Sequence, residues 1–276
     1  MLNYFLLGFL LMIVYLVGCQ ADQIAKPLLF YPSKFPDGYY DDRTISHQEV
    51  SIPNARKESL HGWYFPYDGK PKSVILYCHG NGGNISYLAG VADELRMHLK
   101  SSVLVFDYAG YGKSEGSPSA SGILEDGRAA RRWFAEHCGV KEADIVVYGQ
   151  SLGGSVAIDL AAKDGARALI VESSFTSLGD MGQRMFPFLP VNLLLKENLA
   201  SVKKIGNYQG PVFVSHAKAD QTIPFAQGER LFKAANEPKT FYVPQRGVDY
   251  HSAPLSKEHL DKLREFIDAL PDVISP

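Results

Sequence analysis

The sequence predicts an α/β protein with a mostly parallel central sheet and helices on both of its faces. Three observations support this fold class. Short apolar segments alternate with longer segments of helical periodicity along the chain. Several apolar segments are continuous rather than alternating, as expected for strands that are buried on both faces. The composition is that of a globular protein, with 46% hydrophobic and 21% charged residues.

The charge and the cysteine content exclude several classes of protein. The formal net charge is −2, so the chain lacks the basic excess that nucleic-acid binding requires, and no nucleic-acid partner is expected. A mean hydropathy of −0.10 excludes a polytopic membrane protein. The three cysteines, Cys19, Cys78 and Cys138, are too few for a disulfide framework, and their spacing is not that of a metal site.

Residues 1–19 form a separate N-terminal segment. Residues 1–21 carry no charged side chain, and residues 4–18 are continuously apolar. As a helix, residues 1–19 would span about 28 Å, close to the thickness of a bilayer core. The segment ends in Leu-Val-Gly-Cys19, which resembles the lipobox of bacterial lipoproteins, although no Lys or Arg precedes it.

We therefore expect a lipoprotein signal that is lipidated at Cys19. An uncleaved signal anchor and a plain signal peptide are the alternatives. Each of the three would hold the body of the protein outside the cytosol or at a membrane surface.

Residues 41–272 are predicted to form one domain, joined to the N-terminal segment by a tether at residues 20–40. The first two strands are expected at 47–53 and 60–65, as an antiparallel pair. The other strands are short apolar runs at 73–78, 103–106, 144–148, 168–171, 211–215 and 240–243. The helices have longer amphipathic sequences, at 85–99, 119–137, 152–163, 225–235 and 256–270. Ser119 is the expected N-cap of the second helix. This alternation favours a parallel sheet covered on both faces.

The segment between residues 175 and 207 leaves room only for a small cap. Within it, residues 185–195 include eight apolar residues in eleven. We expect this segment to form either an apolar lid above the site or a helix packed on the core.

The pattern Gly-x-Ser-x-Gly occurs twice, at residues 112–116 and 149–153. A nucleophilic serine of this type lies on a sharp turn between a strand and a helix. The first match is followed by Ser-Pro-Ser, so no helix begins at Ser114, and Asp107 stands where a phosphate-binding loop needs glycine. The second match lies between a predicted strand and a predicted helix. We therefore expect Ser151 to be the nucleophile.

A nucleophilic serine needs a general base, and in this arrangement the chain order is serine, acid, histidine. His251 follows the last predicted strand in a loop, where a catalytic histidine would reach the carboxyl edge of the sheet. His216 precedes every plausible acid except Glu172. His259 lies within the last amphipathic helix and is expected on the surface. These positions favour His251 as the base.

Asp220 is the expected orienting acid. It lies just beyond the strand at 211–215, and its distance of 31 positions to His251 allows one helix and one strand between them. Glu172 is the alternative because it ends the preceding strand at the same edge of the sheet. Asp249 is too close to His251 in sequence to approach its ring from behind.

The glycine-rich segment at residues 79–84 is the candidate oxyanion hole. Glycines let backbone N–H groups approach a substrate oxygen closely. The expected donors are the N–H groups of Asn81 and Leu152; a plain glycine-rich turn is the alternative reading of this segment.

With these residues in place, the chain resembles the α/β-hydrolase superfamily over nearly its whole body. The resemblance lies in residues 79–81, 107–116, 172–178 and the Asp220 segment, and it is closest to the small-capped, membrane-associated branch. Residues 248–251 depart from the usual Gly-x-x-His form. The resemblance implies an α/β-hydrolase fold, serine hydrolase chemistry without a metal or cofactor, and a small-molecule ester or acyl substrate.

The reaction expected first is ester cleavage, then thioester cleavage and then peptide cleavage, because esters and thioesters demand less of the leaving group. A non-catalytic envelope binding protein on the same fold is the alternative from another class.

Overall fold

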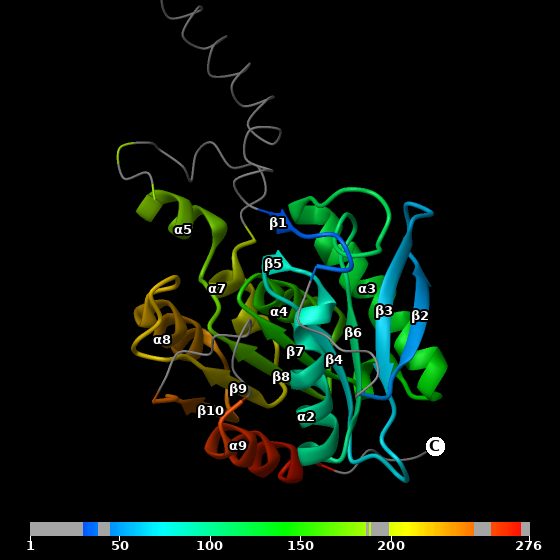
Figure 1. The fold of residues 1–276 in the computed structure, drawn as a ribbon. Helices are drawn as coiled ribbons and strands as arrows, with labels where there is room; N and C mark the ends of the chain where they lie inside the picture. The colour runs from blue at the N-terminus through cyan, green and yellow to red at the C-terminus, as the bar shows by residue number, and fades with distance from the viewer. Residues whose placement is uncertain (1–29, 38–44, 186–187, 189–198, 246–254, 272–276) are drawn as a thin grey trace, which may run out of the picture.

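A computed structural model describes residues 30–37, 45–185, 188, 199–245 and 255–271 (Figure 1). In this part of the chain, the main sheet has eight strands in the order β10-β9-β8-β7-β4-β6-β3-β2. Its strands are β2 (Gln48–Pro53), β3 (Ser59–Phe65), β4 (Val74–Cys78), β6 (Ser102–Phe106), β7 (Val146–Gln150), β8 (Ala168–Glu172), β9 (Val212–Ser215) and β10 (Lys239–Tyr242). The predicted α/β class is confirmed.

In this sheet, β3 runs in the opposite direction to the other strands. It pairs antiparallel with β2 and with β6, and the other pairings are parallel. The antiparallel pair predicted at the start of the body is therefore confirmed. The central strands β4, β6, β7, β8 and β9 are buried along almost their whole lengths, which explains their continuous apolar sequences.

Helices cover both faces of the sheet (Figure 1). One face packs against α2 (Ala89–Leu99) and α9 (Lys257–Asp268), and the other packs against α3 (Ala120–Cys138) and α4 (Leu152–Asp164). The short α7 (Ser201–Lys204) also contacts α4, and α8 (Phe225–Ala234) contacts α7. Two separate apolar cores result, one on each face of the sheet.

Several element boundaries differ from the predicted ones. Residues Glu142–Asp144 form a 3₁₀ turn (η2), so β7 begins later than predicted and continues to Gln150. Ser119 caps α3 as predicted, because its Oγ accepts a hydrogen bond from the N–H of Gly122 at 3.0 Å. The elements not predicted are short: β1 (Tyr31–Pro32), β5 (Gly82–Gly83), α5 (Leu178–Met185), α7 and η3 (Ile205–Asn207), while η1 (Ile85–Leu88) leads into α2.

Three predicted features fall outside the described residues. They are the N-terminal segment with Cys19, most of the apolar segment at 185–195, and the loop that contains His251. Of the predicted tether, residues 30–37 are described and lie against the body of the domain. Within the described ranges, no helix is long and apolar enough to cross a membrane.

Candidate active site

Ser151 lies at a strained turn at the carboxyl edge of the sheet. β7 ends at Gln150 and α4 begins at Leu152, so Ser151 is the single residue between them. Its backbone has φ 52° and ψ −117°. A non-glycine residue with positive φ costs free energy and is found where the surrounding structure enforces it, often at functional sites. The sharp strand-to-helix turn predicted for this serine is therefore present.

The glycines two residues before and after Ser151 are required by close packing. A Cβ atom at Gly149 would lie 2.2 Å from the carbonyl oxygen of Gly153. A Cβ atom at Gly153 would lie 1.9 Å from the carbonyl oxygen of Cys78. Both distances are far below van der Waals contact, so any side chain would displace β4 or α4.

Hydrogen bonds hold the turn on both sides. The Ser151 N–H donates to the carbonyl of Glu172 on β8 at 2.9 Å. The Ser151 carbonyl accepts from the N–H of Gly154 at 3.0 Å and from the hydroxyl of Ser174 at 2.8 Å. The first N–H groups of α4 lie directly after Ser151, and the helix N-terminus favours negative charge there. The turn can therefore stabilise an anion that forms beside the Ser151 side chain.

The other candidate serine, Ser114, is closed off. It is 2% exposed, its hydroxyl donates to the carbonyl of Asp107 at 2.7 Å, and it accepts from the N–H of His61 at 2.8 Å. The chain continues as a turn without a helix, as the sequence predicted. Ser114 has a structural role in joining β3 to the loop after β6.

The glycine-rich loop after β4 lies beside Ser151. A Cβ atom at Gly80 would lie 3.5 Å from the Cβ of Ser151 and 2.9 Å from the side-chain oxygen of Gln150. The preceding His79 is 2% exposed, and burial lowers its pKa, so the ring is neutral at pH 7 and its Nδ1–H donates to the carbonyl of Gly80 at 2.7 Å.

Asn81 is held by hydrogen bonds to its side chain and its carbonyl. Its Oδ1 accepts from the backbone N–H of Tyr31 at 3.3 Å and from the Tyr111 hydroxyl at 3.2 Å. The Asn81 carbonyl accepts from the same hydroxyl at 2.9 Å. Burial raises the pKa of Tyr111, so the hydroxyl keeps its proton and acts as the donor. The contacts that Tyr31 and Tyr111 make with Asn81 were not predicted from the sequence.

Asp220 lies in the loop after β9, at the same edge of the sheet. Its Oδ1 accepts from the N–H groups of Thr222 and Ile223, both at 2.8 Å, and its Oδ2 lies 3.4 Å from Nε2 of His216. Burial opposes ionisation of Asp220, but the His216 contact and the two N–H donors outweigh it and lower its pKa. Asp220 is therefore a carboxylate at pH 7, with part of its side chain exposed.

His259 was predicted on the surface, and this prediction is wrong. His259 is 1% exposed, and its Nε2 lies 2.5 Å from Oε1 of Glu172, which is equally buried. The sequence contained a signal for this position, because His259, Leu263 and Ile267 are spaced by four residues and share the buried face of α9. Glu172, the alternative acid, is thus engaged by α9.

His216 is fully buried, and its Nε2 lies 2.9 Å from the carbonyl of Ile223, to which it donates. His216 therefore supports the loop that contains Asp220 through contacts with Asp220 and Ile223. Of the predicted site residues, Ser151, Leu152, Asn81 and Asp220 are described and lie at the carboxyl edge of the sheet, while His251 is outside the described residues.

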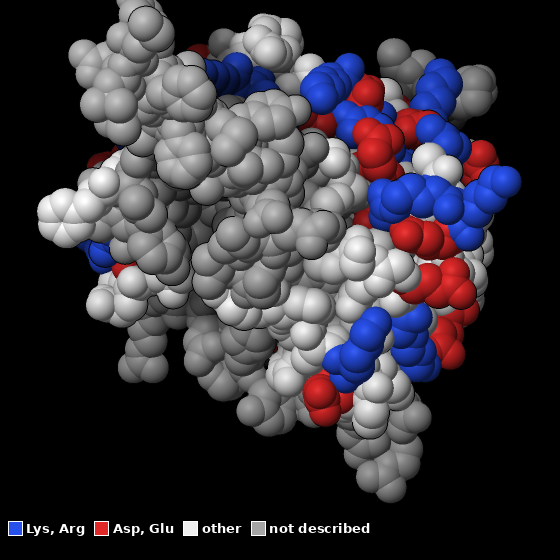
Figure 2. Space-filling view, turned by 90° about the horizontal axis from the view of Figure 1, so that it is seen from above, with Lys and Arg blue, Asp and Glu red and all other residues white. Residues whose placement is uncertain are grey.

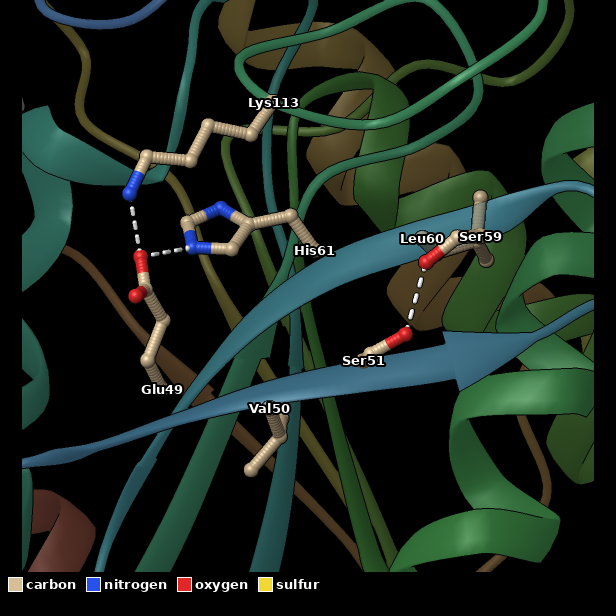
Figure 3. Close-up of a pocket in the computed structure, with 7 residues that line it drawn as sticks. All are labelled: Glu49, Val50, Ser51, Ser59, Leu60, His61 and Lys113. Carbon is tan, nitrogen blue, oxygen red and sulfur yellow. Dashed lines mark hydrogen bonds and ion pairs between the residues drawn. The ribbon is translucent and has the colours of Figure 1, made fainter.

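A pocket of about 350 Å³ lies on the β2–β3 hairpin, away from Ser151 (Figure 3). Three strands, β4, β6 and β3, separate β2 from β7 in the sheet. Glu49 pairs there with Lys113, and its Oε1 lies 2.9 Å from Nε2 of His61. The pKa of Glu49 is lowered, mainly by the hydrogen bond from Lys113. This cluster joins the hairpin to the loop after β6.

Figure 2 views the molecule from above. Many of the visible Lys and Arg side chains lie next to Asp and Glu side chains, mainly at the right of this view. In the described ranges, no group of three or more His, Cys, Asp or Glu side chains is arranged to hold a metal ion.

Comparisons with known proteins agree with this geometry. The sequence profile of the alpha/beta hydrolase family matches residues 75–271. The uncharacterized protein Rv2307c of Mycobacterium tuberculosis is 36% identical over 245 residues, which is 88% of this chain and 86% of the relative. The uncharacterized protein YfhR of Escherichia coli is 30% identical over 97% of this chain and 95% of the relative.

Among solved structures, the Pyrococcus furiosus esterase Pf2001 has the same fold, with a TM-score of 0.69 over 88% of this chain and 98% of that chain, at 18% identity. The sheet order, the turn at Ser151 and the family match lead to one conclusion. The chain belongs to the alpha/beta hydrolase family.

Proposed function

We propose that the protein is a serine hydrolase that cleaves carboxylic esters through an acyl-enzyme. The observation that carries this proposal is the strained backbone of Ser151, held between β7 and α4 at the carboxyl edge of the sheet. Strain of this kind persists only where the rest of the fold enforces it. A strand-to-helix turn of this type typically presents its serine hydroxyl at the carboxyl edge of the sheet.

In the proposed mechanism, His251 takes the proton of the Ser151 hydroxyl while the serine oxygen attacks the ester carbonyl. The C–O bond to the leaving alcohol then breaks as His251 returns the proton to it. Water, activated by the same histidine, hydrolyses the acyl-enzyme and restores Ser151. Asp220 orients the imidazole and stabilises its cation, a role supported by its ionised state at pH 7.

The N–H groups of Leu152 and Asn81 are the proposed oxyanion donors. Leu152 is the first residue of α4, whose N-terminal N–H groups lack acceptors within the helix. The loop that contains Asn81 lies beside Ser151 through Gly80. Preorganised donors of this kind supply much of the rate enhancement in acyl transfer.

Esters are the first substrate class, ahead of thioesters and peptides. The Pyrococcus furiosus protein and a Paenibacillus protein with a TM-score of 0.64 are named esterases, which supports this order. The proposal also includes a small apolar cap at 185–195 and membrane attachment through the N-terminal segment, with lipidation at Cys19. Both features are typical of the small-capped, membrane-associated branch that the sequence resembles.

A fluorophosphonate probe tests the proposal. The parent protein should be labelled once, and peptide mass spectrometry should assign the adduct to Ser151. Ser151→Ala should lose labelling and lower kcat for a short-chain p-nitrophenyl ester by at least about 10⁴-fold. Ser114→Ala is the matched control and should keep both labelling and turnover, with lower stability. A parent that is not labelled would favour a non-catalytic binding protein, and loss of labelling only in Ser114→Ala would move the nucleophile.

A further inference from the structure

The segment before the domain, residues 30–37, crosses the candidate oxyanion loop and is here called the strap. Phe30 begins it and is 5% exposed within the apolar core beside α3 and α4. Its strand β1 (Tyr31–Pro32) pairs in parallel with β5 (Gly82–Gly83), and the N–H of Ser33 donates to the Gly83 carbonyl at 3.0 Å (Figure 1). The strap is therefore bound directly to the loop that follows Asn81.

Asn84 ties the far end of the strap to the same loop. This residue is 2% exposed, and its Nδ2 donates to Oγ of Ser33 at 3.0 Å and to the carbonyl of Asp37 at 2.7 Å. Its Oδ1 accepts from the N–H of Ser86 at 2.9 Å and so caps η1. One buried amide thus joins the strap, the loop and the start of the following helix.

The other side of the strap holds the loop after β6. The Ser33 carbonyl accepts from the N–H of Gly112 at 2.9 Å, and Lys113 lies over the ring of Phe35 at 4.3 Å. That same loop contains Tyr111, whose hydroxyl donates to Asn81. The candidate oxyanion residue is therefore held by Tyr31 from the strap and by Tyr111 from a loop that the strap braces.

The chemistry explains why such a support is needed. Gly80, Gly82 and Gly83 make the loop conformationally permissive, and glycines lose more entropy than other residues when they are ordered. An oxyanion donor works only if it is held in position before the charge develops. A loop of this composition cannot hold Asn81 by its own torsional preferences, so the restraint must come from neighbouring chain.

We propose that the strap is a positioning element of the active site, which orders residues 80–84 so that the Asn81 N–H meets the oxyanion. This inference rests on the proposed serine hydrolase function. It assigns a catalytic consequence to residues that precede the family match at 75–271.

Two variants of the full chain loosen the strap by different routes. Ser33→Pro removes the N–H that donates to Gly83. Asn84→Asp keeps the oxygen that caps η1 but removes the Nδ2 donors to Ser33 and Asp37. Lys70→Ala is the control, because Lys70 is exposed and lies outside the strap, the candidate oxyanion loop and the loop after β6.

Turnover is normalised to the amount of serine labelled by the fluorophosphonate, which removes any effect of partial unfolding. Both variants should lower kcat at least about tenfold, short of the 10²–10³-fold that follows outright loss of an oxyanion donor, with KM nearly unchanged. The affinity for a trifluoromethyl ketone, which forms a hemiketal with the serine, should fall by the same factor as kcat/KM. Amide hydrogen exchange at residues 80–84 should rise. Lys70→Ala should match the parent.

Unchanged normalised kcat and ketone affinity in both variants, with a parent that is labelled at Ser151, would overturn the strap's role and leave the proposed function intact. A parent that is not labelled would overturn the proposed function, and with it the catalytic meaning of the strap.

Discussion

Asp220 carries a carboxylate whose surroundings keep it ionised, and its replacement tests the proposed triad most directly. Asp220→Asn retains an oxygen that can accept from the N–H groups of Thr222 and Ile223, so the loop should keep its shape. The amide cannot stabilise an imidazolium or enforce the correct histidine tautomer. We expect kcat for a p-nitrophenyl ester to fall by about 10⁴-fold with little change in the melting temperature.

Glu172→Gln is the comparison for Asp220→Asn. Glu172 is buried against His259, so we expect this change to lower stability and to leave kcat per labelled serine within about tenfold of the parent. The reverse ranking of the two variants would move the orienting acid from the β9 loop to the end of β8.

At the scale of elements, the junction between β7 and α4 depends on Gly153. Gly153→Ala would drive a Cβ into the Cys78 carbonyl, and we expect a loss of about 3 kcal/mol or more in the free energy of unfolding, at the upper end of overpacking effects. Gly90→Ala is the control: Gly90 is exposed in α2, and an added Cβ there meets no atom within 4 Å. It should stabilise the fold by up to about 1 kcal/mol. Urea unfolding measures both, and equal effects would contradict the crowding argument.

Asp159 joins three helices through buried charge. Its side chain on α4 is fully buried and pairs with Arg128 of α3 at 2.6 Å and Lys204 of α7 at 2.5 Å. Burial acts against its ionisation, but Lys204 and Arg128 outweigh burial and lower its pKa. Asp159→Asn should lower the free energy of unfolding by about 3 kcal/mol at pH 7. This is the low end of the range for a broken buried ion pair, because Arg128 and Lys204 are both partly exposed to solvent.

The pH dependence of this effect has a definite sign. Because the pKa of Asp159 is lower in the folded than in the unfolded state, its contribution is complete above the ordinary aspartate pKa and is lost as pH falls through the folded-state value. The difference between the parent and Asp159→Asn should therefore shrink on acidification in urea unfolding. Asp164→Asn is the control, because it removes an exposed partner of the same Arg128. It should lower the free energy of unfolding by no more than about 1 kcal/mol. A pH-independent difference would contradict the ion-pair explanation.

At the scale of the whole molecule, the strap would limit how far the candidate active site lies from the proposed lipid on Cys19. Phe30 is buried in the domain and lies eleven positions after Cys19, so even a fully extended chain would span at most about 40 Å between them. A lipid at Cys19 would thus hold the Ser151 edge close to the membrane. A diacyl anchor gives stable membrane attachment where a single chain is marginal.

Mass spectrometry of the protein from membranes of its own host tests this anchor. The expected species begins at a lipid-modified Cys19. An intact Met1 would instead support an uncleaved anchor, and an unmodified mature N-terminus would contradict lipidation. In Cys19→Ser the lipid mass should be absent, and ester hydrolysis should be unchanged because Ser151 and Asp220 lie in the folded domain and not in residues 1–19.

The local pattern of the sequence determined the fold class, the order of the elements and the position of the turn at Ser151. Continuous apolar runs specify strands buried on both faces, and the glycines around Ser151 specify a turn that no side chain could enter. These features depend on neighbours close in sequence, so they can be predicted from it. The chain order of serine, acid and histidine similarly nominated Asp220 and His251.

Only the tertiary structure decided the contacts between segments distant in sequence. It showed that His259 turns inward to Glu172, that Tyr111 and Tyr31 hold Asn81, and that residues expected to form part of a tether bind the candidate oxyanion loop. Strand β1 has only two residues, too few to show the alternation of apolar and polar side chains that predicts a strand. Its partner β5 consists of two glycines, which have no side chains to form such a pattern. Pairings of this kind arise from the packing of the strap against the loops that follow β4 and β6, which no local pattern encodes.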